Sequence, residues 1–227
     1  ASGVLDDASN LTVNGGSFNL QSFSETLDIV TLASGSITGT GTLSASAFNV
    51  ESGTISANLA GPAALTKTTA GTVTLSGTNP YTGGTFLNAG VLEAASQNGL
   101  PSGGSLTFDG GKERTTATTT ISGPVIFGAG GATIDTVGRA TLSGQISGSG
   151  GLTKEGLGTL VINTVSPQLA GLTVNTGDLE LPVGGTLIVT GGLTVGTDGL
   201  LSLDGGLVSA NSFANGGEIK LLAGARL

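Results

Sequence analysis

The stretch LTKTTAGTVTLSGTNPYTGG, residues 65–84, decides the fold, because a second copy of it, LTKEGLGTLVINTVSPQLAG, occupies residues 152–171. The two copies align without a gap at an offset of 87 residues, and eleven of 29 aligned positions are identical. Lysine, proline, asparagine and glutamate positions match together with the glycines. Self-similarity at a fixed offset indicates a repeat architecture.

A shorter unit recurs throughout the chain: a few alternating apolar residues, a bend with Asn, Asp or Glu and Gly, and another alternating run. Examples are LTVNGGSFNL (11–20), FNVESGTISA (48–57) and LSLDGGLVSA (201–210). Alternation at period two indicates a strand with one buried face. Asn, Asp and Gly tolerate the left-handed backbone of a sharp bend. The pattern predicts strands of about three to five residues, shorter than the usual length.

Short strands of this kind fit two folds. Asn-Gly and Asp-Gly between strands indicate antiparallel hairpins, as in a β-sandwich. Several bends contain three residues instead, such as 51–53 and 88–90, and the offset of 87 is close to four turns of about 22 residues. We therefore predict an all-β protein with a parallel β-solenoid of about ten coils, and keep an antiparallel β-sandwich as the alternative. The polar stretch GKERTTATTT (111–120) is expected to be a protruding loop or a polar coil edge.

The domain prediction is one continuous solenoid over residues 1–227, with repeat copies at about 61–96 and 148–182. No Pro/Ser-rich linker or charge run divides the chain. The sequence opens with ASGVLDD and has no initiator methionine, so we expect a processed or trimmed piece of a longer polypeptide.

Composition excludes much of enzyme chemistry. The chain has 42 glycines and no cysteine, histidine, methionine or tryptophan. Zinc, blue-copper, iron–sulfur and haem sites therefore lack their usual ligands, and a Ser-His-Asp or Cys-His system is impossible within the chain. The net charge of −8 disfavours binding to nucleic acid or to an anionic membrane. No apolar run approaches the roughly 20 residues that span a bilayer.

Both copies resemble the autotransporter-associated β-strand repeat. The first copy matches its pattern at Leu65, Lys67, Gly71, Thr72, Val73, Leu75, Gly77, Asn79, Tyr81, Thr82, Gly83, Gly84, Thr85, Asn88, Gly90 and Leu92. The second matches at Gly148, Gly150, Leu152, Lys154, Gly156, Gly158, Leu160, Ile162, Gly171, Val174, Gly177 and Leu179, and has Gln168 in place of Tyr81. The resemblance implies a right-handed parallel β-helix that serves as the scaffold of large secreted or surface-displayed bacterial proteins.

Paired acidic residues are the first candidates for a site, because β-helices host many polysaccharide-cleaving enzymes, whose chemistry uses two carboxyl groups about 5–10 Å apart. The nearest groupings are Asp178 with Glu180 and Asp198 with Asp204. We favour the interpretation that these are solvated acids at bends and outer faces. A lyase would also need a basic cluster, and Lys112 and Arg114 lie beside a single acid in the polar stretch.

Other candidates are weaker. Residues 194–206 offer Asp198 and Asp204 for calcium but lack a calcium-binding nonapeptide array. GAGGAT (128–133) lacks the ending of a phosphate-binding loop. Tyr81 could stack on a sugar, although packing over a neighbouring coil is favoured.

Two further features are given structural explanations. We interpret Lys67 and Lys154 as outward residues that prevent aggregation, and the Asn10 glycosylation sequon as chance. No catalytic, cofactor-binding or metal-binding residue is assigned, and no cofactor is expected.

Three functional hypotheses follow. The favoured one is a non-enzymatic, extracellular or cell-surface stalk with a structural or adhesive role. The alternatives are a self-assembling subunit of an extracellular filament or sheath, and a solenoid that binds or cleaves polysaccharide. The expected partners are further copies of the chain, stacked end to end or laterally, or cell-surface and matrix components, with polysaccharide as another option. We expect no nucleic acid partner and no membrane insertion by this segment.

Overall fold

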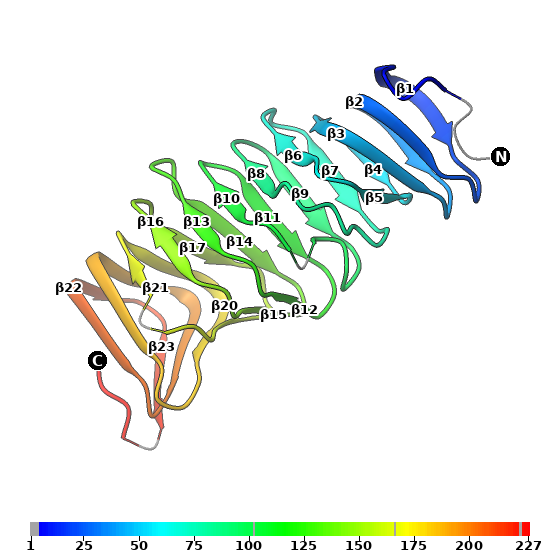
Figure 1. The fold of residues 1–227 in the computed structure, drawn as a ribbon. Coiled ribbons are helices and arrows are strands. Elements are labelled where there is room, and N and C mark those ends of the chain that lie inside the picture. The colour runs from blue at the N-terminus through cyan, green and yellow to red at the C-terminus, as the bar shows by residue number, and fades with distance from the viewer. Residues whose placement is uncertain (1–4, 102, 166, 223) are drawn as a thin grey trace.

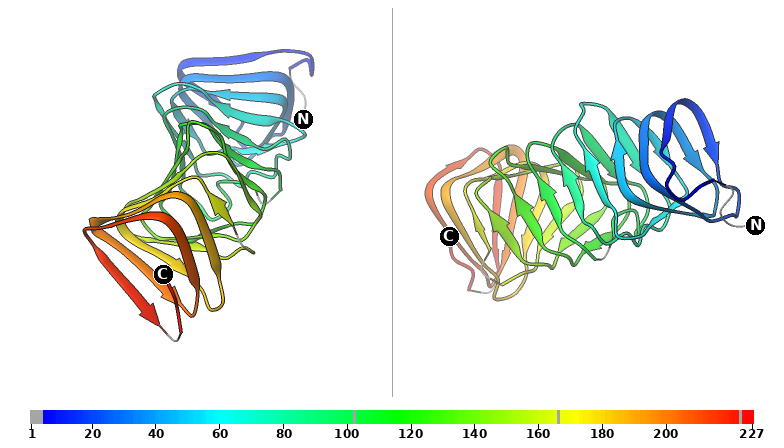
Figure 2. Two further views of the ribbon diagram at one scale, coloured as in Figure 1. Left: turned by 90° about the vertical axis from the view of Figure 1, so that its left-hand side faces the viewer. Right: turned by 45° about the horizontal axis from the view of Figure 1, so that its top comes forward.

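The computed structural model describes residues 5–101, 103–165, 167–222 and 224–227. In this part of the chain the strands pair in parallel and wind into about ten stacked coils, with the termini at opposite ends of a rod (Figure 1). Two further views show the same stacking along one axis (Figure 2). The prediction of a β-solenoid is confirmed, and the antiparallel sandwich is not supported.

The strands are short in the middle of the rod and longer near its ends, where single strands continue around a corner. They are β1 (Leu11–Asn19), β2 (Glu25–Thr38), β3 (Thr42–Val50), β4 (Gly53–Ile55), β5 (Asn58–Ala60), β6 (Ala64–Lys67), β7 (Thr72–Leu75), β8 (Thr85–Leu87), β9 (Val91–Ala94), β10 (Leu106–Phe108), β11 (Lys112–Thr115), β12 (Thr119–Ile121), β13 (Val125–Phe127), β14 (Ala132–Thr136), β15 (Arg139–Leu142), β16 (Ile146–Gly148), β17 (Leu152–Glu155), β18 (Thr159–Ile162), β19 (Gln168–Leu169), β20 (Leu172–Leu181), β21 (Thr186–Asp204), β22 (Leu207–Asn215) and β23 (Glu218–Leu222).

The coils have three walls, which we call faces 1, 2 and 3. Face 1 contains the ladder β6, β8, β10, β13 and β16. Face 2 contains the ladder β4, β7, β9, β11, β14 and β17, which continues into β20. Face 3 contains β12, β15 and β18, which also continue into β20. Because β20 takes part in two ladders, the walls join at its corner.

Alternation along the strands places apolar residues inside all three faces. On face 1 Val30, Phe48, Leu65 and Leu106 occupy one inward column. Their side chains are buried, as are those of nearly all other inward Leu, Val and Ile. Each side chain that is fully buried in such a column contributes about 1.5–3 kcal/mol to stability. Short strands are therefore sufficient, because the coils on either side cover their inward residues.

The coil is shorter than the sequence repeat suggested. Leu65 lies in register with Thr85, then Leu106, Val125 and Ile146, so four coils span 81 residues, about 20 each. The expectation of four 22-residue turns is therefore wrong, and an offset of 87 carries the second copy six residues further round the coil. Leu65 consequently lies on face 1, whereas its counterpart Leu152 lies on face 2.

Face 3 is interrupted where the first copy carries its Asn-Pro-Tyr sequence. Asn79 takes the place of a strand there: its Oδ1 accepts a hydrogen bond from the amide of Leu59 at 2.9 Å, and its Nδ2 donates to the carbonyl of Gly99 at 2.8 Å. The buried Asn79 amide thus joins the coils on either side of it. This contact explains why an asparagine can replace backbone pairing at this point.

The stretch 111–120 is not a protruding loop or a coil edge. It contains β11 on face 2 and the start of β12 on face 3, and Glu113, Thr115 and Thr119 are buried inside the rod. The prediction is wrong because polarity alone does not indicate exposure: strand alternation directs every second residue inward whatever its polarity.

Candidate functional site

The two lysines of the repeat point into the rod, contrary to the expectation that they lie outside. Lys154 is fully buried, and its Nζ donates hydrogen bonds to the carbonyl oxygens of Glu155 at 2.7 Å, Gly156 at 2.7 Å and Thr176 at 3.1 Å. The Glu155 carbonyl ends β17 and the Gly156 carbonyl begins the corner that follows, whereas the Thr176 carbonyl belongs to the corner of the next coil. The ammonium therefore ties two successive corners together.

Lys67 does the same on face 1. It is fully buried, and its Nζ donates to the carbonyl oxygen of Thr69 and lies 3.1 Å from the Thr69 hydroxyl. That hydroxyl donates in turn to the carbonyl of Glu51 at 3.1 Å, so the corner is tied to the preceding coil. Lys67 and Lys154 each come two residues after a leucine, Leu65 or Leu152. Residues two apart in a strand face the same side, so this spacing is the sequence signal that both lysines point inward with the leucines.

A glycine stands over one of the carbonyls that each lysine binds. A Cβ on Gly90 would lie 2.2 Å from the Thr69 oxygen, and a Cβ on Gly177 would lie 2.3 Å from the Gly156 oxygen. Both glycines have positive φ, +66° and +68°. The lysine and the glycine of each copy therefore serve one corner, which explains why both positions match at the same offset.

Burial lowers the pKa of both lysines. Desolvation is the largest cause for Lys154, whose pKa falls to about 8, and the nearby Asp135, Asp178 and Glu155 carboxylates oppose the change. For Lys67 desolvation again lowers the pKa, opposed by Glu51.

We expect Lys154→Met to remove a pH dependence of stability. The pKa of Lys154 is about 8 in the folded protein against 10.5 for a free lysine. The free energy of unfolding therefore rises between pH 8 and pH 10.5, where the unfolded protein binds the lysine proton and the folded protein does not. The slope is at most about 1.4 kcal/mol per pH unit, and the gain is lost as the pH falls towards 8. In urea unfolding between pH 7.5 and 10.5, the free energy of unfolding should rise less with pH in Lys154→Met than in the wild type. Lys220→Met, at an exposed position, is the control that should keep it.

Inside face 2, Glu113, Thr115 and Thr136 form a second polar group. Both Glu113 carboxyl oxygens and both threonine hydroxyls are buried without a hydrogen-bond partner among the described residues. Thr115 and Thr136 lie opposite one another in the ladder, and Glu113 is two residues before Thr115. Sequence reasoning missed this group, because residues 112–115 are all polar and show no alternation that could reveal which side faces inward. The ladder places Glu113 inside, where it pairs with the inward Leu92.

Charged residues on the outer side of the rod form ion pairs, some of which bridge across a coil. Lys112 Nζ lies 2.5 Å from a Glu155 oxygen although β14 separates their strands. Arg114 lies between Glu93, at 3.8 Å, and Asp135, at 3.6 Å. Lys112 and Arg114 are thus paired with several acids and do not form the basic cluster of a lyase.

The predicted carboxylate pairs are only partly brought together. Asp178, Glu180 and Asp204 line a shallow pocket of about 210 Å³ near the C-terminal end. Asp198 does not line it, because this residue lies in register with Thr176 at a corner. Both oxygens of Glu180 accept hydrogen bonds from Arg139, at 2.9 and 3.1 Å.

Asp178 is the remaining carboxylate of interest in this pocket. Desolvation is the largest cause of its raised pKa, while a hydrogen bond with Ser202 lowers it. Glu180 is occupied by Arg139, so the pair does not offer two free carboxylates for acid–base catalysis. Among the described residues no group of three or more Asp, Glu, His or Cys could hold a metal ion.

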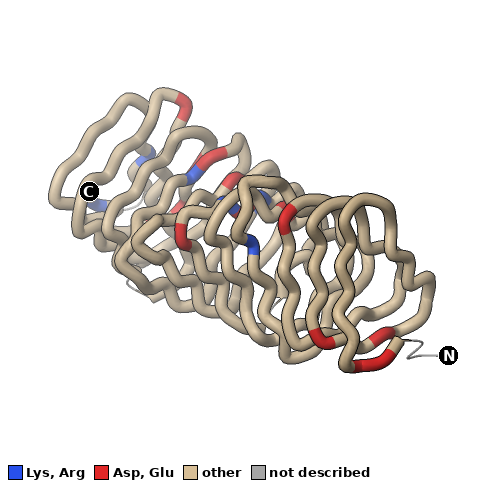
Figure 3. The backbone as a smooth tube through the Cα atoms, turned by 90° about the horizontal axis from the view of Figure 1, so that it is seen from above, with Lys and Arg blue, Asp and Glu red and all other residues tan. Residues whose placement is uncertain are grey.

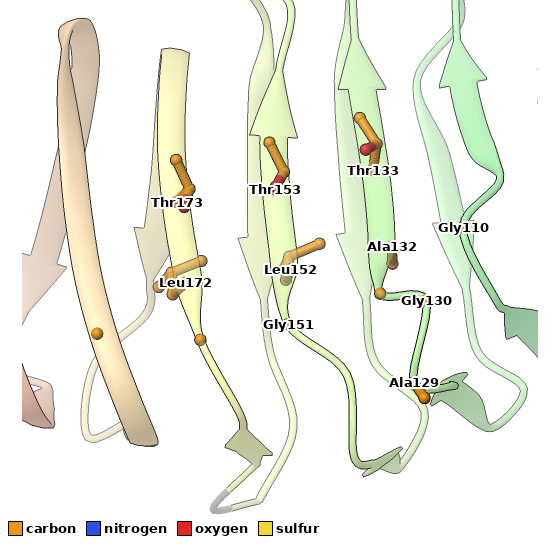
Figure 4. A pocket seen from close by; sticks show the side chains of 13 residues that line it. Gly110, Ala129, Gly130, Ala132, Thr133, Gly151, Leu152, Thr153, Leu172 and Thr173 are labelled. Atoms are coloured by element: carbon orange, nitrogen blue, oxygen red, sulfur yellow. The ribbon is translucent and has the colours of Figure 1, made fainter.

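A groove of about 320 Å³ crosses several coils at the start of face 2 (Figure 4). Gly151 and Gly171 form part of its floor, and Thr133, Thr153 and Thr173 stand in register along it. The groove lining has no charged or aromatic side chain. GAGGAT (128–133) contributes to it, but its last two residues already belong to strand β14 and not to the helix of a phosphate-binding loop.

Tyr81 is buried and so cannot stack on a sugar. Its hydroxyl lies 2.7 Å from the Thr85 hydroxyl, and its ring meets the Phe48 ring edge-on at a centroid distance of 6.1 Å. The expectation that it packs over a neighbouring coil agrees with this contact, since Phe48 belongs to the preceding coil. Pairs of this geometry contribute about 0.5–1.5 kcal/mol beyond their buried area.

The comparisons with known proteins agree with the repeat and the solenoid. Residues 65–94 match the passenger-associated transport repeat, which confirms the resemblance to autotransporter passengers. The chain is also 35% identical over 150 residues to the adhesin BmaC autotransporter of Brucella suis biovar 1 (strain 1330). That alignment covers 65% of this chain and 4% of the relative, so the chain matches a small part of a much longer protein. No solved structure matches.

The fold and the repeat thus define a passenger-like β-solenoid scaffold. No helix in the part of the chain that the structure describes is long and apolar enough to cross a membrane.

Proposed function

We propose that the solenoid is a non-enzymatic stalk segment of a larger secreted or surface-displayed bacterial protein, and that this protein adheres to cell-surface or matrix components. The observation that carries the proposal is the parallel ladder on three faces, which extends the rod coil by coil. The relative's description as an adhesin supports the adhesive part.

A stalk should tolerate the loss of a whole coil but not of half a coil. Val125 lies in register with Ile146, so deleting residues 125–145 joins Pro124 to Ile146 and keeps every later strand on its face. Deleting only residues 125–134 moves the later strands to the wrong face. We expect the first variant to keep a cooperative β-sheet unfolding transition in a rod shorter by about 4.8 Å, and the second to lose it. Equal damage from both deletions would contradict a modular stalk.

Adhesion can be measured with beads coated with the purified solenoid, applied to cultured epithelial cells and to immobilised matrix. Beads coated with the half-coil deletion are the matched control. Binding several-fold above this control supports the adhesive role. Binding equal to the control would leave a stalk that only positions other parts of the protein and would remove the adhesive role from this segment.

End-to-end association is a second candidate, favoured by apolar surface exposed at both ends of the rod. Both ends are net acidic: residues 1–66 carry five acids and no Lys or Arg, and residues 198–227 carry three acids and two basic residues, Lys220 and Arg226. Figure 3 marks the acidic and basic positions along the rod. Apolar side chains are exposed at both ends, including Phe23 and Phe213. Exposed apolar surface at both ends of the rod favours head-to-tail contacts, which do not close and give filaments. Electron microscopy at high protein concentration tests this, and monodisperse single rods would exclude it.

A further inference from the structure

The middle of the rod contains a concentration of unsatisfied polar groups. Glu113, Thr115 and Thr136 are fully buried, and the four side-chain oxygens they contribute have no hydrogen-bond partner among the described residues. Leaving a buried donor or acceptor unpaired is unfavourable, because the group loses its hydrogen bonds to water and gains none in the protein. Because the three residues lie on adjacent strands, β11 and β14, the cost falls on the contact between two successive coils.

The coil that contains β11 is also weakly packed elsewhere. Its inward side chains on faces 2 and 3 are Glu113, Thr115, Thr119 and Ile121, so only one of the four is apolar. The Thr119 hydroxyl does find a partner, the carbonyl of Gln97 at 3.2 Å. Coils of a repeat protein contact mainly their neighbours, and the stability of the array is approximately a sum of such terms. A weak coil in the middle therefore limits the cooperativity of the whole rod.

Within the described ranges, no cation neutralises Glu113 from the strands packed against it. Its register partners are Leu92 on β9 and Ile134 on β14, both apolar. The inward cation in the same column is Lys154, which lies beyond Ile134, two coils or about 10 Å away. Lys154 already donates to three carbonyl oxygens.

The remaining charges near Glu113 lie on the outer side of the sheet. Lys112 and Arg114, on the same strand, are paired with acids there. Glu93 on β9 and Asp135 on β14 are the acids of the neighbouring strands and belong to the same outer set. Ionised Glu113 would thus be a buried charge without a counterion or a hydrogen-bond donor, an arrangement that proteins avoid.

We propose that the coil containing β11 is a pH-dependent break point, at which the rod opens and uncouples into an N-terminal block (β1–β10) and a C-terminal block (β13–β23) when Glu113 loses its proton. The closed coil holds a neutral carboxylic acid. The open coil exposes this acid to water, where it ionises. Alkaline conditions therefore favour the open coil and acidic conditions the closed one.

The size of the effect follows from proton linkage. Desolvation is the main cause that raises the pKa of Glu113 well above the ordinary value of 4.5, and Asp135 adds to it. Opening releases a proton wherever the pH lies between the open-state and closed-state pKa values. The opening equilibrium constant should then increase about tenfold for each pH unit across that interval and level off above it.

Hydrogen exchange of the intact 227-residue chain, resolved by peptide, tests the proposal between pH 5.5 and 7.5. After correction for intrinsic exchange, protection of β11 and β12 should fall by up to about tenfold per pH unit. The control segment is β3, which has no buried charged residue. This window lies below the pKa of about 8 of Lys154, whose proton linkage has the opposite sign.

Glu113→Gln is the matched variant, because it keeps the shape and removes the titration. Protection of β11 should then vary with pH no more than that of β3. Glu113→Leu serves as a second non-titrating variant if the glutamine variant does not fold. Equal pH dependence of β11 in the wild type and the variant would overturn the proposal, as would wild-type protection that is independent of pH.

Discussion

Glu113→Leu is expected to stabilise the solenoid by about 2–4 kcal/mol at neutral pH, although it replaces one of only 15 acidic residues in the chain. The wild-type carboxyl group lies between Leu92 and Ile134, fully buried and without a hydrogen bond to any described residue. Leucine has a similar volume and would continue the apolar column. The gain arises because the folded protein no longer has to keep a carboxyl group out of water.

Urea unfolding at pH 7 measures the change. Thr115→Val is a graded companion: it removes one unpartnered hydroxyl at constant shape and should contribute about 1 kcal/mol. Glu155→Leu is the control for simple loss of negative charge, since Glu155 lies on the outer side and is paired with Lys112. It should not stabilise the protein. A loss of stability in Glu113→Leu would contradict the description of Glu113 as an uncompensated buried group.

The repeat predicted the fold, but its offset gave the wrong coil length. An 87-residue spacing between Leu65 and Leu152 was divided into four equal turns, whereas the ladder from Leu65 to Ile146 shows four coils in 81 residues. The sequence could not reveal this difference, because each of the three faces offers similar strand positions. The two copies therefore form the same strand–corner–strand arrangement, β6 and β7 in the first and β17 and β18 in the second, although one begins on face 1 and the other on face 2.

The inner polar residues could have been predicted in part. Lys67 and Lys154 each lie two residues after an inward leucine, so the alternation of a strand alone places them inside. Their partners could not be predicted, because the carbonyls that bind the ammonium groups belong to corners whose geometry depends on the coil register. Glu113 could not be predicted, because β11 is polar throughout and a carboxylate in an apolar column contradicts the usual preference of charged residues for the surface.

The largest loss of stability is expected from Gly90→Ala, at about 3–4 kcal/mol. Alanine at φ +66° has an unfavourable left-handed backbone, which costs about 1–2 kcal/mol. Its Cβ would also lie 2.2 Å from the Thr69 carbonyl oxygen and 2.5 Å from that of Gly71. Both atoms are backbone, so the coils must move apart, and overpacking of this kind costs about 1–3 kcal/mol. Displacing the Thr69 carbonyl also weakens its hydrogen bond from Lys67.

Substitutions at two other glycines separate the cost of the left-handed backbone from the cost of the close Cβ contact. Gly184 has φ +75°, and no described atom lies within 4 Å of the position that a Cβ would take, so Gly184→Ala should show the backbone cost alone, about 1–2 kcal/mol. Gly103 has open space and no positive φ, so Gly103→Ala should be neutral or slightly stabilising. Urea unfolding of the three variants gives the comparison. If Gly90→Ala costs no more than Gly184→Ala, the close approach of glycine to the lysine-bound corner does not constrain the repeat. A clear excess would mean that the lysine and the glycine of each copy act as one structural unit, the lysine binding the corner carbonyl from inside and the glycine leaving room for it from the adjacent coil.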